Sequence, residues 1–143
     1  MGNTLLSIAK ADIKTAKNLV NSDDKYQKHQ AAYLTQQGVE KTLKYAISLK
    51  TGGQPWGHDI TKLVILAQQN GVDVPDFICK KAKMITSWEV VSRYYPNDIY
   101  MFECLNVIHK NMSILYCMKV GQKLDQKRRE VRPKGLAARR KAP

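Results

Sequence analysis

The chain has 143 residues, 43% of them hydrophobic, so it is long enough to bury one core and short for two ordinary domains. It has no apolar run close to the roughly 18 residues of a membrane-spanning helix, and no charged-then-apolar leader at its start. These features predict a single folded domain in the cytoplasm.

The net charge of +12 is concentrated at the C-terminal end, where nine lysines and arginines face two acids from Gly121 onward. This segment also contains Pro133 and Gly135 and has few apolar residues. It cannot bury enough surface to offset the entropy cost of ordering. We therefore expect a helical body over residues 1–121 and a basic, disordered tail over residues 122–143.

The first two helices are predicted over residues 4–20 and 24–51, joined by a turn short enough to make them an antiparallel hairpin. Glu40 and Lys44 stand four positions apart on the second helix, in the favourable order for an ion pair. The apolar stripe of this helix steps by three and four residues through Ala32, Gln36, Val39, Leu43 and Ile47.

Three more helices are predicted after the break at Gly52-Gly53-Gln54-Pro55. The third begins at His58-Asp59, with Asp59 as its N-cap, and closes at Asn70-Gly71. The fourth is capped by Asp76 and stops before Pro96, and the fifth runs from Asp98 to about Lys123. Because no segment alternates with period two, the sequence predicts an all-α, five-helix up-and-down bundle.

Six large apolar side chains in the last two predicted helices exceed what so small a bundle can enclose. An exposed surplus of this kind usually marks an interface, so we expect a homodimer. The six residues are Phe77, Trp88, Met101, Phe102, Met112 and Tyr116.

The three cysteines, Cys79, Cys104 and Cys117, show no CxxC spacing and no pairing with histidines at metal-ligand spacing. Free thiols are the expectation, with no metal site and no cofactor.

Four polar motifs occur in a characteristic order, and together they resemble the HEPN family (higher eukaryotes and prokaryotes nucleotide-binding). Members of this family show A-D-h…A, Q-Q-x-h-E-K-x-L-K, H-D-h-x-x-L and R-Y-P, where h is apolar. The resemblance covers residues 5 to about 120. The motifs here are Ala11-Asp12-Ile13…Ala16, the run from Gln36 to Lys44, Trp56-Gly57-His58-Asp59-Ile60…Leu63, and Ser92-Arg93-Tyr94-Tyr95-Pro96.

Many HEPN proteins are metal-independent ribonucleases whose site is an arginine followed, after four to six residues, by a histidine. The arginine stabilises charge on the phosphate and the imidazole moves protons. None of His29, His58 and His109 has an arginine at that distance, and Asp98 occupies the position at the shortest spacing from Arg93. The resemblance therefore implies a member without this catalytic motif.

Arg93, Tyr94 and Tyr95 are the leading ligand-binding candidates, because an arginine and two tyrosines at a helix junction can hold a phosphate and stack a base. The alternative is that Arg93 pairs with an acid such as Glu40 while the tyrosines cover the end of the bundle.

The other candidates on the body are His58, Lys41 and Lys44. His58 either contacts the ligand or only packs beside a helix start, and the two lysines extend a basic groove if their helix faces that way. His29, on the first turn of the second helix, is expected in solvent, and His109 is expected to pack at the surface.

The basic tail allows three interpretations: it confers solubility, binds phosphates without sequence preference, or docks on an acidic partner. The residues proposed for phosphate contact are Lys127, Arg128, Arg129, Arg132, Arg139 and Arg140.

The resemblance implies a non-catalytic nucleotide-binding or nucleic-acid-binding module. HEPN proteins of this kind partner a minimal nucleotidyltransferase or belong to similar two-component, toxin–antitoxin-like systems. One alternative is a toxin-like ribonuclease that uses other residues, such as Arg93 with His109. A second is a nucleic-acid-binding protein that acts through its tail alone.

Overall fold

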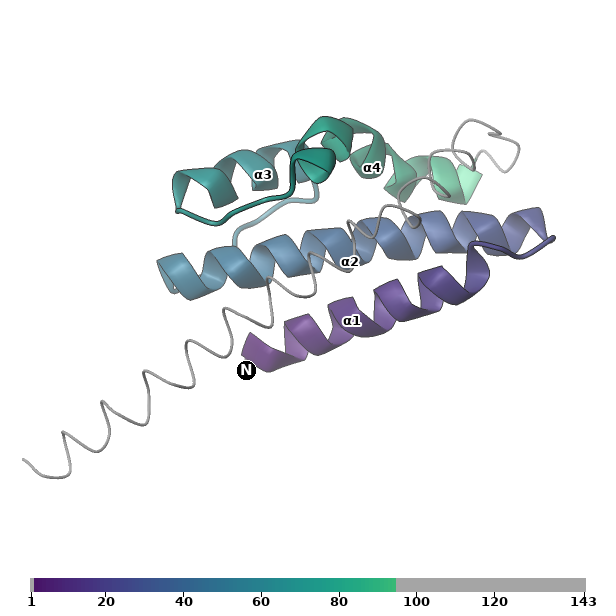
Figure 1. Ribbon diagram of the computed structural model, residues 1–143, viewed down its shortest axis with the longest axis horizontal. Helices are drawn as coiled ribbons and strands as arrows, with labels where there is room; N and C mark the ends of the chain where they lie inside the picture. Colours follow the sequence, from purple (N-terminus) through teal and green to yellow (C-terminus); the bar gives the residue numbers. More distant parts are fainter. Residues whose placement is uncertain (1, 95–143) are drawn as a thin grey trace, which may run out of the picture.

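The computed structural model describes the backbone of residues 2–94 and the side chains of residues 5–89. Over these residues the chain forms four helices and no strand: α1 (Gly2–Leu19), α2 (Lys25–Thr51), α3 (Ile60–Gln69) and α4 (Asp76–Tyr94) (Figure 1). The predicted all-α class is confirmed. The fifth helix, predicted from Asp98, and the basic tail lie outside the described residues.

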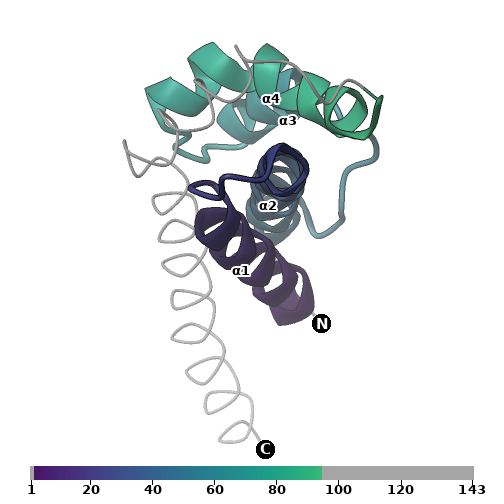
Figure 2. The ribbon, with the colours of Figure 1, turned by 90° about the vertical axis from the view of Figure 1, so that its right-hand side faces the viewer.

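The long helix α2 is the centre of the fold. In two perpendicular views α1 packs along one side of α2, and α3 and α4 form a layer on the opposite side (Figures 1 and 2). The predicted stripe is buried throughout, but α2 also buries residues outside it, among them Ala31, Thr35 and Tyr45. A single stripe was expected, whereas a helix enclosed between two layers is covered around most of its circumference.

The helix ends follow the cap residues closely. The Asp24 carboxylate accepts a hydrogen bond from the Tyr26 N–H at the start of α2, and Gly52, with φ of 80°, ends the helix in the left-handed region. The Asp59 carboxylate accepts from the N–H groups of Thr61 and Lys62, which confirms the predicted N-cap of α3.

The fourth helix begins one residue earlier than predicted. Asp76 is its first residue rather than its cap. The carbonyl of Pro75 accepts the hydrogen bond of the Cys79 N–H, so the proline occupies the capping position. A proline at a helix start costs no intrahelical hydrogen bond, because the first N–H groups of a helix have no partner within it.

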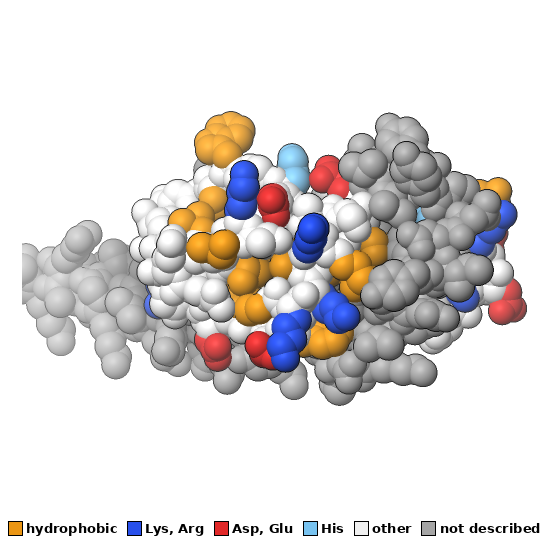
Figure 3. Space-filling model, turned by 90° about the horizontal axis from the view of Figure 1, so that it is seen from above, with side chains coloured by type: hydrophobic (Ala, Val, Ile, Leu, Met, Phe, Trp, Pro, Cys, Tyr) orange, Lys and Arg blue, Asp and Glu red, His pale blue; other side chains and the backbone are white. Residues whose placement is uncertain are grey.

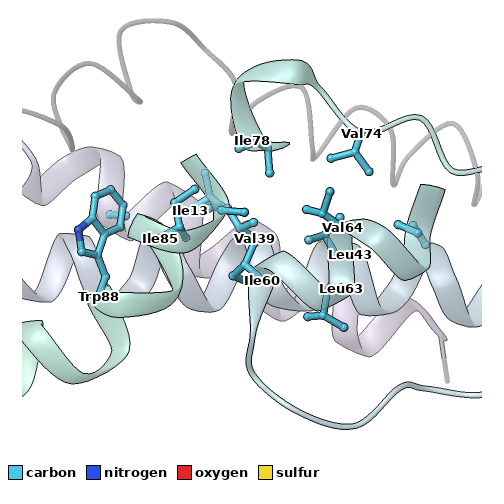
Figure 4. Packing of buried hydrophobic residues seen from close by; sticks show 14 of the residues in the cluster. Ile13, Val39, Leu43, Ile60, Leu63, Val64, Val74, Ile78, Ile85 and Trp88 are labelled. Atoms are coloured by element: carbon cyan, nitrogen blue, oxygen red, sulfur yellow. The ribbon is translucent and has the colours of Figure 1, made fainter. Parts of the chain in front are cut away.

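The core lies where α4 crosses α2 and α3, and Ile13 of α1 joins it (Figure 4). Trp88 is 1% exposed, and Phe77 is half-buried against the same core. The bundle therefore accommodates these two of the six large apolar side chains, and the other four lie outside the described residues. Among the described helices, none combines the length and apolar character that a membrane crossing requires.

Candidate functional site

A buried carboxylate on α2 is the centre of a polar network. The side chain of Glu40 is only 5% exposed. Its Oε1 accepts a hydrogen bond from Gln36 Nε2 (3.1 Å) and lies 2.9 Å from His58 Nδ1. Its Oε2 lies 3.5 Å from Lys44 Nζ, which confirms the predicted ion pair. Gln37 Nε2 donates to Gln36 Oε1 (2.7 Å), so the network extends one residue further along the helix.

The helical repeat builds half of this network. Residues four apart lie above one another on a helix, so Gln36, Glu40 and Lys44 share one face of α2. The other half comes from the α2–α3 loop (residues 52–59), which brings His58 back onto Glu40. Gly57, with φ of 96°, permits the turn just before His58.

The histidine is held at one ring nitrogen and open at the other. Because a carboxylate paired with lysine only accepts hydrogen bonds, His58 Nδ1 carries the proton in its contact with Glu40. The side chain of His58 is 64% exposed, which leaves Nε2 to meet a ligand. That nitrogen accepts a hydrogen bond when the ring is neutral and donates one when it is protonated.

The loop that presents His58 is also fixed beyond it. Asp59 caps α3, and the Ile60 N–H donates to Thr86 Oγ1 on α4 (2.9 Å). Thr86 therefore joins α4 to the start of α3, close to the histidine. Arg93 follows Thr86 by seven residues, about 10 Å further along α4 at 1.5 Å per residue.

The predicted ligand residues separate into three groups. Lys44 and His58 meet through Glu40, whereas Lys41 Nζ lies 2.5 Å from Asp12 Oδ2 and so joins α2 to α1. Arg93 and Tyr94 belong to the last turn of α4, but their side chains, and Tyr95 entirely, lie outside the described residues. The six candidate residues of the tail also lie outside them.

The charges of the network are largely balanced within it. Lys44 has a side-chain exposure of 9% and is paired with Glu40, so its ammonium group positions the carboxylate rather than facing a ligand. The imidazole of His58 is the most exposed polar group of this network.

Two side chains were not anticipated in their observed positions. His29 is 3% exposed, so the expectation that it lies in solvent is wrong, because burial on α2 already begins in its first turns. Trp56 is 98% exposed in the α2–α3 loop, and sequence reasoning assigned it no role. The sequence feature that could have drawn attention to Trp56 is its place between Pro55 and Gly57, two residues before His58.

The thiol of Cys79 is half-buried at the start of α4. Burial raises the pKa of Cys79 above its ordinary value, and the nearby negative charges of Asp76 and Asp73 raise it further. Within the described part of the chain, no three histidine, cysteine, aspartate or glutamate side chains group in a way that would hold a metal ion.

The fold and the site define an all-α domain in which two of the four polar motifs, the run from Gln36 to Lys44 and the one that begins at His58, meet at the buried carboxylate of Glu40. The family model described as HEPN domain matches residues 3–119, which is most of the chain. The chain belongs to the HEPN domain family. No curated protein and no solved structure matches it.

Proposed function

We propose that this HEPN domain is a non-catalytic module that binds a nucleotide or nucleic acid at His58. The observation that supports the proposal is the exposed imidazole fixed by the buried carboxylate of Glu40. Fixing one ring nitrogen orients the other before a ligand arrives, which lowers the entropy cost of binding. A protonated Nε2 suits a phosphate oxygen, and a neutral one suits a donor on a base or sugar.

The binding surface that we propose extends from His58 toward the end of α4. An arginine forms two parallel hydrogen bonds to a phosphate, and aromatic rings stack on bases. We therefore assign Arg93 to a phosphate and Tyr94 and Tyr95 to a base, on the basis of residue type and of their position after Thr86. Lys41 and Lys44 belong to this proposal only as members of salt bridges with Asp12 and Glu40, which offset their charge.

Absence of catalysis is proposed because the Arg-x4–6-His motif is missing from the sequence. Lys44, the cation nearest the histidine in the network, is already neutralised by Glu40. Cleavage of RNA needs a proton-transfer group together with a cation that stabilises the developing charge. The alternative, a toxin-like ribonuclease, would be established by RNA cleavage in chelator that is lost in both Arg93→Ala and His109→Ala.

The binding test compares two variants of the full chain in titrations with a labelled single-stranded RNA and with mononucleotides. His58→Ala should weaken binding about tenfold, which is the usual contribution of a hydrogen bond to a charged group. Gln69→Ala, exposed at the far end of α3, is the matched control and should bind like the unmodified protein. If His58→Ala and Gln69→Ala bound with equal affinity, His58 would not be part of the binding site. If no nucleotide and no RNA bound to the unmodified protein, the proposed binding function would be wrong.

We further propose that the module is a homodimer and serves as the substrate-binding partner of a minimal nucleotidyltransferase, in a two-component, toxin–antitoxin-like system. Family membership supports this role, and a binding module without catalytic residues needs a partner that performs chemistry. Light scattering that returned a 16.3 kDa particle at micromolar concentration would contradict the dimer. Failure to co-purify with a nucleotidyltransferase encoded next to it would contradict the partnership.

A further inference from the structure

Trp56 is the most exposed of the four large hydrophobic side chains that the described residues leave in solvent. It is 98% exposed, against 60% for Tyr26, 51% for Ile65 and 43% for Ile8. Trp88, by contrast, is 1% exposed in the core. An indole offers more apolar surface than any other side chain, so leaving it fully in water forgoes a large stabilisation of the fold. The exposure of Trp56 is better explained if its indole contacts a ligand.

The loop holds the indole near the fixed histidine. Two peptide units separate Trp56 from His58, so their Cα atoms lie at most about 7 Å apart. His58 is anchored to Glu40, and Ile60 is anchored to Thr86 of α4. A single nucleotide can therefore contact the indole and the imidazole together.

The surroundings of Trp56 suit a base better than a protein. Its loop neighbours are Gly52, Gly53, Gln54, Pro55 and Gly57, of which only Pro55 carries an apolar side chain, so the loop itself forms no apolar patch. On the described part of the adjacent α3–α4 face, apolar side chains lie in small groups between lysines and acids (Figure 3). Protein interfaces instead surround an aromatic anchor with further apolar contacts that exclude water.

The charges next to the loop favour a phosphate. Lys50 precedes the loop and Lys62 follows it, and both are exposed. The acid in between, Asp59, directs Oδ1 to the backbone N–H groups of Thr61 and Lys62. An aromatic plane beside positive charge is the combination with which proteins hold single-stranded nucleic acid.

We infer that Trp56 is the stacking platform for an unpaired nucleobase, with His58 contacting the phosphate or sugar of the same or the next nucleotide. This inference rests on the proposed function and specifies its ligand as single-stranded. In a duplex the bases are already stacked on one another, and a side chain on a loop cannot reach their faces.

The test uses the contrast between the two tryptophans of the chain. An eight-nucleotide single-stranded RNA should quench the exposed Trp56 emission in parallel with binding measured by anisotropy, and the duplex with its complement should quench it far less. Trp56→Ala should weaken binding about tenfold or more, and Trp56→Phe should restore most of the affinity because the aromatic plane returns. Tyr26→Ala, which removes an exposed aromatic at the start of α2, is the matched control and should change nothing.

The outcomes separate this inference from the proposed function. RNA that binds with unchanged affinity to Trp56→Ala, and without quenching, overturns the stacking role and leaves the function intact. RNA and nucleotides that do not bind at all overturn both. A blue shift of Trp56 emission with protein concentration alone would assign the indole to an interface between copies of the chain, and the inference would be wrong.

Discussion

Glu40 is the residue on which the candidate site depends most. Moving a carboxylate out of water is costly unless charge and hydrogen bonds compensate for it. Glu40 has both, from Gln36, His58 and Lys44. The side chain therefore acts as a positioning group, and its replacement should be felt in stability as well as in binding.

Glu40→Gln should lower the free energy of unfolding by about 3 kcal/mol, because it leaves the Lys44 ammonium group buried without a counter-charge. Urea unfolding followed by circular dichroism measures the change. The matched control is Lys80→Gln, which breaks the Lys80–Asp76 pair of the same i,i+4 spacing but with side chains 73% and 79% exposed. Exposed pairs contribute little, so this variant should unfold like the unmodified protein.

A double replacement distinguishes the charge from the shape of the side chain. Glu40→Leu with Lys44→Met removes both charges together, and most of the lost stability should return because no buried charge is left unpaired. Binding that depends on an oriented His58 should stay weak in this variant. A Glu40→Gln protein as stable as the Lys80→Gln control would show that the network contributes nothing to folding.

The thiol of Cys79 gives a second prediction about a single residue, which is tested by varying the pH. Its pKa is raised, first by burial and then by Asp76, so the folded state favours the neutral thiol. The contribution of this thiol to folding stability is complete at pH values below its ordinary pKa. It is lost as pH rises through the higher pKa that the thiol has in the folded protein. In a Cys104→Ser, Cys117→Ser background, the midpoint of the alkylation rate against pH should be higher for folded protein than for the same protein in urea.

Asp76→Asn should lower that midpoint part of the way, because Asp76 is the second cause of the shift after burial. Equal midpoints in folded and unfolded protein would show that neither burial nor the acids act on the thiol.

At the scale of elements, the contact between α1 and α2 depends on a glycine. A methyl group at Gly38 would overlap Ile13 Cδ1, lie 2.5 Å from Ile13 Cγ1, and lie 3.3 Å from the Ala9 carbonyl oxygen. Ile13 is 2% exposed and has little room to move. The absence of a side chain at Gly38 therefore sets how closely the two helices approach.

Gly38→Ala should destabilise the domain by about 1–2 kcal/mol, since the cost of overpacking exceeds the gain of about 1 kcal/mol in helix propensity. Thermal unfolding measures it, with Gly53→Ala as the control, because a methyl group at Gly53 meets open space. In an Ile13→Val background, which removes the overlapping methyl, the cost of Gly38→Ala should shrink. A variant more stable than the unmodified protein would show that Ile13 repacks freely.

The helices were largely predictable because their signals are local. Asp59 and Gly71 mark the ends of α3 through side-chain and backbone geometry that involves only neighbouring residues. The spacing of residues by three and four identified the buried stripe of α2, but such a pattern marks only one face of a helix. It missed the second buried face and the burial of His29, which depend on the layer that packs there.

The candidate site was predictable only in part, because it is assembled by a contact between residues far apart in the chain. Spacing alone predicts the ion pair of Glu40 and Lys44. Their burial, and the contact of Glu40 with a histidine 18 residues away, require the path of the α2–α3 loop. The exposure of Trp56 also depends on the path of this loop, so the sequence alone does not predict it.

At the scale of the whole molecule, the positive charge divides between two regions with different expected roles. The residues up to 120 carry 15 basic and 10 acidic side chains, and the remaining segment has nine basic against two acidic. A site at His58 and Trp56 would read the chemistry of one nucleotide, whereas a basic tail without aromatic residues would contact phosphates alone. The two modes differ in their response to salt.

Deleting residues 122–143 should therefore remove most of the salt dependence of duplex DNA binding. A tail that neutralises about five phosphates gives a slope near −4 in a plot of log affinity against log salt, and the slope should flatten without it. A full-length variant with the tail sequence scrambled is the matched control and should keep the slope, because only charge matters.

The truncated protein should retain its helical circular dichroism and its weak, nearly salt-independent affinity for mononucleotides, since the tail has no apolar stripe with which to pack. Arg93→Ala in the truncated protein should then weaken that remaining affinity, because an arginine fork on phosphate is short-range and depends less on the ion atmosphere. A truncated protein that bound duplex with an unchanged slope would place the electrostatic surface on the helical body. The tail would then have no part in binding.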